Sequence, residues 1–129
     1  MIPEKLLPAF QGVFPAALST MDNDGNPNVS FISQVFFVDT RHVAISNQFM
    51  SKTMRNILAN GKATVNVIMP ENFKSYYLYL KHVESLTSGQ VFDDMSMQLE
   101  AIASVTGMSD VFKLRSSEIF EVYEIVEIP

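Results

Sequence analysis

The most concentrated chemistry in the sequence is a polar loop that leads into a predicted helix. Its side chains are hydroxyls, amides and two cations, contributed by Ser46, Asn47, Gln48, Ser51, Lys52, Thr53, Arg55 and Asn56. The start of a helix has free backbone N–H groups and the positive end of the helix dipole, and both favour an anion. These residues at a helix start therefore predict a phosphate-binding site.

The same residues also fit a purely structural interpretation. Ser51 can serve as an ordinary N-cap and Lys52 as a solvated charge. The loop contains no Gly-rich cradle and no Walker-type signature. The residues alone leave both interpretations open.

A second polar feature interrupts an apolar run. Ser33 and Gln34 place a hydroxyl and an amide within the predicted strand 28–38. Burying such groups without a partner would cost roughly 1–3 kcal/mol each. We expect them to bond either to protein or to a ligand.

Other catalytic and metal chemistry has little support in the sequence. There is no Cys, and His42 and His82 are each predicted to be lone packing or surface residues. Met95, Met97 and Met108 are interpreted as core residues, and the acidic stretch 22–27 as a hairpin rather than a calcium loop. We therefore predict no metal and no protein nucleophile or general base, so a cofactor must supply any redox chemistry.

Length and composition restrict the remaining possibilities. The 129 residues predict one domain over 1–129, and the net charge of −5 with scattered cations predicts neither nucleic-acid nor membrane binding. Without a signal-peptide pattern or a long apolar run, we expect a cytoplasmic protein. The hydrophobic fraction of 47%, with ten Phe and four Tyr, leaves apolar surface for a second copy and predicts a homodimer.

Hydrophobic periodicity predicts a strand-rich chain. Strands are expected at 14–21, 28–38, 42–46, 63–69 and 75–85, with two more between 111 and 128 separated near Ser116–Ser117. Short helices are expected at 3–10 and after Ser51, the latter burying Met54, Ile57 and Leu58 and ending at Asn60–Gly61. A longer helix is expected from Thr87 to about Val105, burying Phe92, Met95, Leu99, Ile102 and Ala103 and stopped by Gly107. The Tyr-rich strand 75–85 is typical of an edge or a subunit contact.

With this order of elements, the segments VAISNQFMSKTMRNI and VFKLRSSEIFEV resemble the pyridoxamine 5′-phosphate oxidase-like family of FMN-binding split barrels. In that family a loop of the form S-(R/K)-K-x-x-N-(L/I) holds the FMN phosphate, and Ser51, Lys52, Asn56 and Ile57 match it. Thr53 stands where the family commonly has Lys. The stretch 28–38 also lacks the Arg and Lys of pyridoxamine phosphate oxidases.

The resemblance implies a mostly β fold, a six-stranded antiparallel split β-barrel with flanking helices. It implies FMN as cofactor, with the flavin ring against the strand of Ser33 and Gln34 and two equivalent sites shared by two subunits. The cofactor-binding residues implied are Ser33, Gln34, Ser46, Asn47, Gln48, Ser51, Lys52 and Thr53.

The resemblance also restricts the function. It implies an FMN-dependent oxidoreductase, related to pyridoxamine 5′-phosphate oxidase, that acts on an unidentified small molecule. Split-barrel relatives include flavin reductases, deazaflavin-dependent enzymes and haem-handling proteins. A non-catalytic flavin-binding or sensing module is the alternative.

Overall fold

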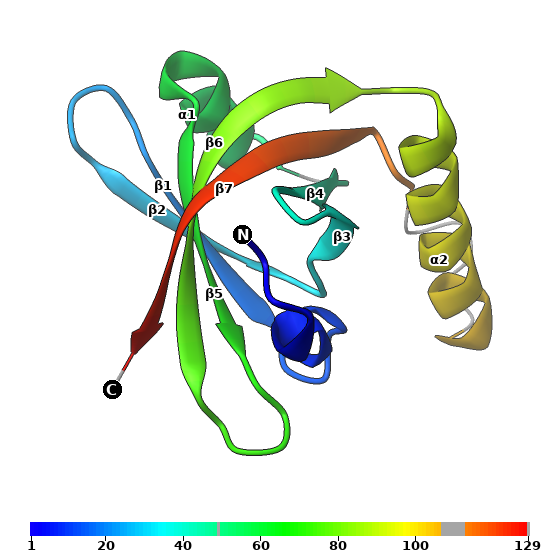
Figure 1. The fold of residues 1–129 in the computed structure, drawn as a ribbon. Coiled ribbons are helices and arrows are strands. Elements are labelled where there is room, and N and C mark those ends of the chain that lie inside the picture. Colours follow the sequence, from blue (N-terminus) through cyan, green and yellow to red (C-terminus); the bar gives the residue numbers. More distant parts are fainter. Residues whose placement is uncertain (49, 107–112, 129) are drawn as a thin grey trace.

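The computed structural model describes residues 1–48, 50–106 and 113–128. Its strands are β1 (Ala16–Met21), β2 (Pro27–Ile32), β3 (Phe36–Asp39), β4 (His42–Asn47), β5 (Lys62–Ile68), β6 (Ser75–Leu86) and β7 (Ser116–Ile128). Its helices are the 3₁₀ helix η1 (Glu4–Phe10), α1 (Lys52–Asn60) and α2 (Gln90–Thr106). The strands form one antiparallel sheet in the order β2-β1-β5-β6-β7-β4-β3 (Figure 1). The predicted mostly β fold with flanking helices is confirmed.

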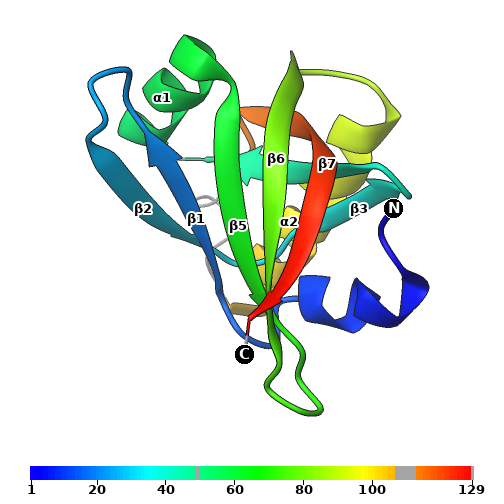
Figure 2. The same cartoon turned by 60° about the vertical axis from the view of Figure 1, so that its left-hand side comes forward.

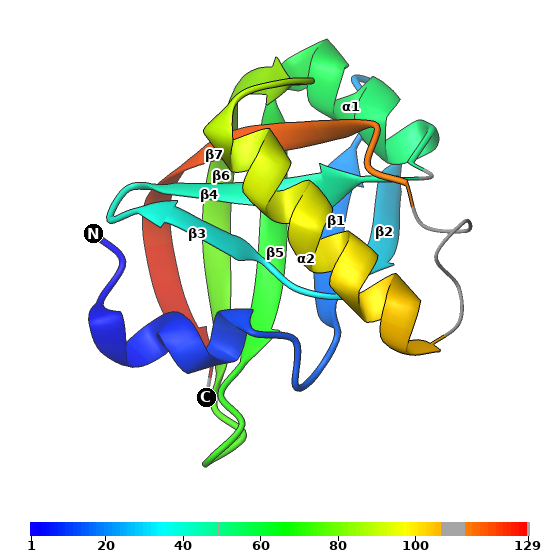
Figure 3. The ribbon, with the colours of Figure 1, turned by 90° about the vertical axis from the view of Figure 1, so that its right-hand side faces the viewer.

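The sheet curls around one main apolar core. Leu18, Val65, Leu78 and Phe120, from β1, β5, β6 and β7, are fully buried in it, and η1 adds Leu6. Helix α1 lies beside the β1–β2 hairpin, and η1 lies toward the other end of the sheet (Figure 2). Helix α2 packs through Met95 against a smaller cluster on β3, β4 and β7 (Figure 3). The helices thus cover the ends and one side of a curved sheet.

The prediction of one strand over 28–38 is wrong, because the chain bends at Ser33 and divides it into β2 and β3. The backbone N–H of Val35 donates to the carbonyl of Phe10, 3.1 Å away, instead of to a neighbouring strand. The bend also lies against Gly12, where a Cβ would stand 2.6 Å from the Ser33 carbonyl oxygen. Strand β2 then pairs with β1 and β3 with β4, at opposite edges of the sheet.

This division changes the predicted number of strands. In the part of the chain that the structure describes, the sheet has seven strands instead of six, and β2 and β3 are its two edges. The sheet is therefore not closed, in agreement with the predicted split β-barrel. The Tyr-rich strand β6 lies between β5 and β7, which contradicts the prediction of an edge strand. The subunit contact predicted for the same strand stays a prediction.

The C-terminal segment also differs from expectation. Its described part contains the strand β7, which begins at Ser116, so the predicted break at Ser116–Ser117 is instead the start of a strand. These two residues pair with Asn47 and Ser46 of β4 and are buried. Residues 113–115 have no regular structure, and the predicted strand positions 111–112 lie outside the described residues.

The helices follow the predicted pattern with three corrections, one of which is that Met97 of α2, interpreted as a core residue, is 68% exposed. In α1, Ile57 is buried and Met54 half-buried, but Leu58 is 68% exposed, because Asn56 instead faces the sheet. Helix α2 begins at Gln90 rather than near Thr87. Met95 is buried, while Phe92 and Leu99 are half-buried. The side chains of Ile102 and Ala103, and the predicted stop Gly107, lie outside what the structure describes.

Within the described residues, no helix combines the length and the apolar character needed to cross a lipid bilayer.

Candidate functional site

Helix α1 begins with an uncapped N-terminus. Ser51 occupies the N-cap position, but its hydroxyl makes no capping hydrogen bond. The backbone N–H of Arg55 donates to the Ser51 carbonyl at 3.0 Å, so the preceding N–H groups have no acceptor within the helix. The side chains of Ser51 and Lys52 are exposed beside these groups. The helix start therefore presents free donors together with an accessible cation.

Thr53 faces inward and joins α1 to β2. It is 2% exposed; Asn28 Nδ2 donates to its Oγ1 at 2.9 Å, and the hydroxyl of Ser30 lies 2.6 Å from the same atom. Thr53 occupies the position where the family commonly has a lysine, and the neutral side chains of Asn28 and Ser30 both hydrogen-bond to it. Asn28 and Ser30 were not among the predicted site residues.

Asn47 holds the loop that precedes α1. Its side chain is buried, its Oδ1 accepts the backbone N–H of Met50 at 3.2 Å, and its Nδ2 donates to Ser116 Oγ at 3.2 Å. Asn47 thus connects the start of α1 to β7.

Gln48 has a buried carbonyl oxygen that lacks a hydrogen-bond donor among the described residues. Its Nε2 donates to the hydroxyl of Ser46 over a long 3.4 Å, and its Oε1 is buried with no hydrogen-bond partner from residues 1–48, 50–106 or 113–128. Buried carbonyl oxygens nearly always have a partner, so this oxygen is suited to accept from a ligand donor.

Ser33 and Gln34 lie in a different part of the structure from the loop. Ser33 is exposed at the bend, and Gln34 Nε2 donates to Gln98 Oε1 of α2 at 3.1 Å. Gln34 lines a cavity of about 320 Å³ whose other walls are Leu7, Phe10, Gln11, Val35, Phe36, Phe37 and Gln98. The predicted site residues are therefore distributed between the α1 start and this cavity.

Asn56 belongs to the same polar stretch of the sequence, but its side chain faces the sheet and not the helix start. It is buried and donates to Thr20 Oγ1 of β1 at 3.1 Å, which fixes α1 on the sheet. Its role in this structure is to anchor the helix.

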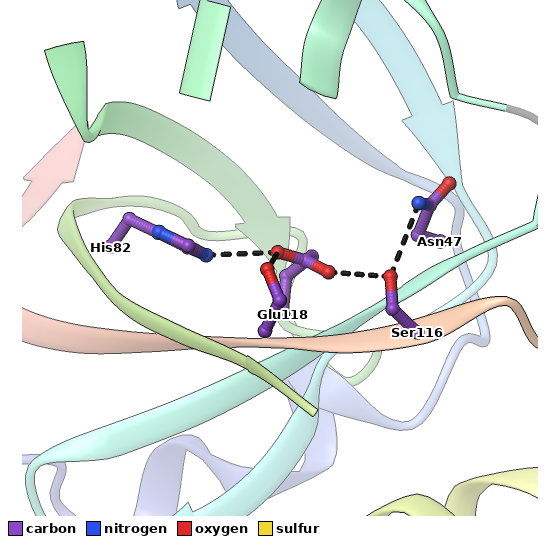
Figure 4. A network of polar contacts seen from close by, with 5 residues as sticks. Asn47, His82, Ser116 and Glu118 are labelled. Atoms are coloured by element: carbon purple, nitrogen blue, oxygen red, sulfur yellow. Dashed lines mark hydrogen bonds and ion pairs between the residues drawn. The ribbon is translucent and has the colours of Figure 1, made fainter. Parts of the chain in front are cut away.

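A buried polar network lies between β6 and β7, and it corrects the prediction of a lone His82 (Figure 4). Glu118 is fully buried, and its Oε1 lies 2.8 Å from His82 Nε2. Ser85 donates to the same Oε1, and Ser116 donates to Oε2, both at 2.5 Å. Because Ser116 also accepts from Asn47, the network connects His82 to the loop before α1.

His42 also has a carboxylate partner, Asp39, with Nδ1 and Oδ1 2.8 Å apart. The backbone N–H of Arg41 donates to Asp39 and, with His42, holds the pKa of that carboxyl below its usual value. The pair closes the β3–β4 turn.

The network was detectable only in part from the sequence. Ser116, Ser117 and Glu118 are three consecutive polar residues inside a run of alternating character, and the first two are interpreted in the sequence as a break between strands. All three are buried, and the Ser117 hydroxyl has no hydrogen-bond partner within the part of the chain that the structure describes. Apart from the bond between Ser116 and Glu118, their side-chain contacts come from residues 33 to 69 positions away, which local patterns do not contain.

Among the described residues, no group of three or more His, Cys, Asp or Glu side chains is arranged to hold a metal ion. His82 lines a second cavity of about 480 Å³, together with Asn60, Gly61, Lys62, Leu80, Lys81, Glu121 and Tyr123.

Comparisons with solved structures show the fold. The chain resembles an FMN-binding protein from Syntrophomonas wolfei subsp. wolfei, with 20% identity and a TM-score of 0.80 over 98% of this chain and 87% of that one. It also resembles HutZ, the heme storage protein from Vibrio cholerae, with 18% identity and a TM-score of 0.61 over 98% and 95% of the two chains.

Sequence comparison adds one relative and the family. An uncharacterized protein of Methanocaldococcus jannaschii, MJ0282, is 32% identical over 82 residues, which are 59% of this chain and 55% of that protein. The match thus spans about half of the relative's length. Residues 2–123 match the family described as pyridoxamine 5′-phosphate oxidase. The chain therefore belongs to the pyridoxamine 5′-phosphate oxidase family.

Proposed function

We propose that this protein is a flavoprotein that binds FMN, with the phosphate at the start of α1, and that it is an oxidoreductase acting on a small molecule. The observation that carries the proposal is the uncapped N-terminus of α1 beside the exposed Lys52, in a chain of this family. The S. wolfei structure, described as FMN-binding, supports the choice of ligand.

The residues at the α1 start fit a phosphate group. Free N–H groups and the helix dipole favour the anion, and Lys52 and the Ser51 hydroxyl add a cation and a donor. Thr53, Asn28 and Ser30 contribute hydroxyl and amide groups but no charge. Lys52 therefore supplies much of the positive charge for this site.

The cavity near Gln34 supports a position for the flavin ring there. Gln34 is four positions after Ser30, which lies beside Thr53, and an extended chain of four steps spans at most about 14 Å. A ligand with a phosphate at one end and a planar ring at the other can reach both. The cavity at Gln34 offers apolar walls and three amide side chains, Gln11, Gln34 and Gln98.

When bound, FMN supplies the electron transfer, and the protein supplies binding, orientation and exclusion of water. Asn47 fixes the loop backbone, and Gln48 Oε1 is an acceptor for a donor on the ligand. The proposal further includes one domain over residues 1–129 and a homodimer.

A flavin-binding or sensing module without turnover is the second candidate. The observation that favours it is that the described side-chain hydrogen bonds of residues 46–53 go to amides, hydroxyls and backbone. Chemistry that needs a proton donor in this loop would therefore need one from the substrate or from solvent.

The test is an absorption and fluorescence titration of the purified protein with FMN. We expect stoichiometric binding and quenched flavin fluorescence, followed by reoxidation of the reduced flavin by an acceptor if the protein is an enzyme. A parallel titration with haemin tests the ligand class found in HutZ: a Soret shift at stoichiometric haemin, with no FMN binding, would refute the proposal.

A further inference from the structure

Glu118 carries a carboxyl group in the buried interior of the sheet. It is fully buried. Its Oε1 contacts Ser85 and His82, and its Oε2 accepts a hydrogen bond from Ser116. Burying a carboxylate is costly unless it is paired and hydrogen-bonded. These contacts meet that requirement, and the His82 side chain, 12% exposed, lies at the boundary between the carboxylate and a cavity.

One branch of this network reaches the proposed phosphate site. Ser116 donates to Glu118 Oε2, so its oxygen is oriented to accept from Asn47 Nδ2. That bond fixes the Asn47 amide with Oδ1 toward the backbone N–H of Met50. The backbone is held too, since the N–H of Arg115 donates to the Asn47 carbonyl at 2.8 Å. A chain of three hydrogen bonds thus runs from a buried carboxylate to the loop that begins α1.

The other branch ends away from that site. Ser85 donates to Oε1 at the same 2.5 Å distance, but it is an exposed residue near the end of β6. The two serines therefore bind the same carboxylate, and only Ser116 continues to the loop.

We propose that Ser116, oriented by the buried Glu118 carboxylate, is a positioning residue for the ligand-binding loop: acting through Asn47, it holds the start of α1 in the geometry that receives the ligand phosphate. This inference rests on the proposed function. His82 is the partner that allows the carboxylate to remain in the core, and when protonated it forms an ion pair with it.

The test compares Ser116→Ala with Ser85→Ala as its matched control, by fluorescence titration with FMN and with riboflavin. Loss of one net hydrogen bond corresponds to about a three- to tenfold change in affinity. We expect Ser116→Ala to weaken FMN by about that factor and riboflavin, which lacks the phosphate, less than twofold. We expect Ser85→Ala to bind both ligands as wild type does, and Ser116→Thr, which keeps the hydroxyl, to restore FMN binding.

A second measurement does not need a ligand. Amide hydrogen exchange at Met50 is expected to be faster in Ser116→Ala than in wild type and unchanged in Ser85→Ala. If Ser116→Ala does not fold, Ser116→Cys keeps the size while weakening both hydrogen bonds, and the same results are expected of it.

The outcomes separate the inference from the proposed function. If wild type binds no FMN, the proposed function fails, while the exchange rates at Met50 still test the positioning role. Equal losses for FMN and riboflavin, or equal exchange at Met50 in both serine variants, would overturn the positioning role even if FMN binds.

Discussion

Lys52 has an exposed side chain at the first position of α1, next to backbone donors without partners in the helix. An FMN phosphate carries nearly two negative charges at neutral pH, more than the helix dipole compensates. We predict that Lys52→Ala weakens FMN by one to two decades, because a charge-assisted hydrogen bond contributes roughly 1.5–3 kcal/mol. Riboflavin affinity should stay nearly unchanged, as measured by flavin fluorescence.

The matched control for this prediction is Lys62→Ala, which removes an exposed cation at the start of β5. It should leave FMN binding within about twofold, since a distant exposed charge is largely screened by salt. Similar losses in the two variants would show that net charge, and not the α1 start, governs affinity.

Asp22 organises the β1–β2 turn through its carboxylate. The backbone N–H of Asn26, its side-chain amide and the backbone N–H of Asp24 all donate to it, and they hold its pKa below the ordinary value of 3.8. Because the pKa is lower when folded, the carboxylate stabilises the protein above pH 3.8, and this contribution is lost as the pH falls through the folded pKa.

We therefore predict that the stability difference between wild type and Asp22→Asn becomes smaller from pH 5 to pH 3. Urea unfolding at both pH values measures it, and the shared titration of other groups cancels in the difference. A difference that stays constant between the two pH values would mean that the turn bonds do not favour the charged form.

Which residues the sequence could predict depends on how local their contacts are. Ser51, Lys52 and Gly61 are placed by their distance from a helix end, which the sequence displays directly. Asn28 and Ser30 reach Thr53 from 25 and 23 positions away, and Glu118 reaches His82 from 36. A single sequence contains no signal for pairs of this kind, so the neutral cluster and the buried network required the structure.

At the scale of elements, α1 ends at Gly61 in the left-handed conformation, with φ of 71°, and its N–H donates to the Ile57 carbonyl at 2.7 Å. Residues with a Cβ adopt this conformation at a cost, although Asn tolerates it better than Ala. We predict that Gly61→Ala lowers the unfolding free energy by about 1 kcal/mol and Gly61→Asn by less. A new Cβ would lie no closer than 3.9 Å to the nearest atom, so the expected cost comes from the backbone conformation and not from a steric clash. Equal losses for the two variants in urea unfolding would contradict this.

The elements that were predicted incorrectly share a physical cause. In 28–38, the apolar alternation continues although the chain changes from pairing with β1 to pairing with β4. In 111–128, the polar residues Ser116 and Ser117 are buried because they pair with the distant strand β4. Periodicity reports which side of a strand faces the core, but it does not report which strand lies beside it. The bend at Ser33 and the start of β7 at Ser116 both depend on such neighbours.

At the scale of the whole molecule, two exposed apolar faces are candidates for the proposed dimer contact. One is the outer face of β6–β7, with Tyr77, Tyr123 and Val126, and the other is the β1–β2 edge, with Met21, Val29 and Phe31. On the first face Tyr79 lies 6.3 Å from both Tyr77 and Tyr123, measured between ring centroids. Aromatic residues of this kind are enriched at interfaces.

We predict a homodimer at micromolar concentration that uses the β6–β7 face. The double variant Tyr77→Lys with Val126→Lys, a pair facing each other across β6 and β7, should become monomeric in light scattering. Val29→Lys with Phe31→Lys on the β1–β2 edge is the control and should remain dimeric. A monomeric wild type would refute the homodimer. A monomeric Val29→Lys, Phe31→Lys variant with a dimeric Tyr77→Lys, Val126→Lys variant would assign the contact to the β1–β2 edge.

The order of strands in the sheet has a consequence for how the chain reaches its final shape. Residues 16–47 form two hairpins, β1–β2 and β3–β4, whose own contacts are local and whose turns can close early. These hairpins lie at opposite ends of the sheet order, and β5, β6 and β7 stand between them. During synthesis, β3–β4 would therefore wait until β7, which follows β5 and β6 in the chain, joins it to the rest of the sheet, and the loop at Asn47 would take its final geometry only after Ser116 has been added.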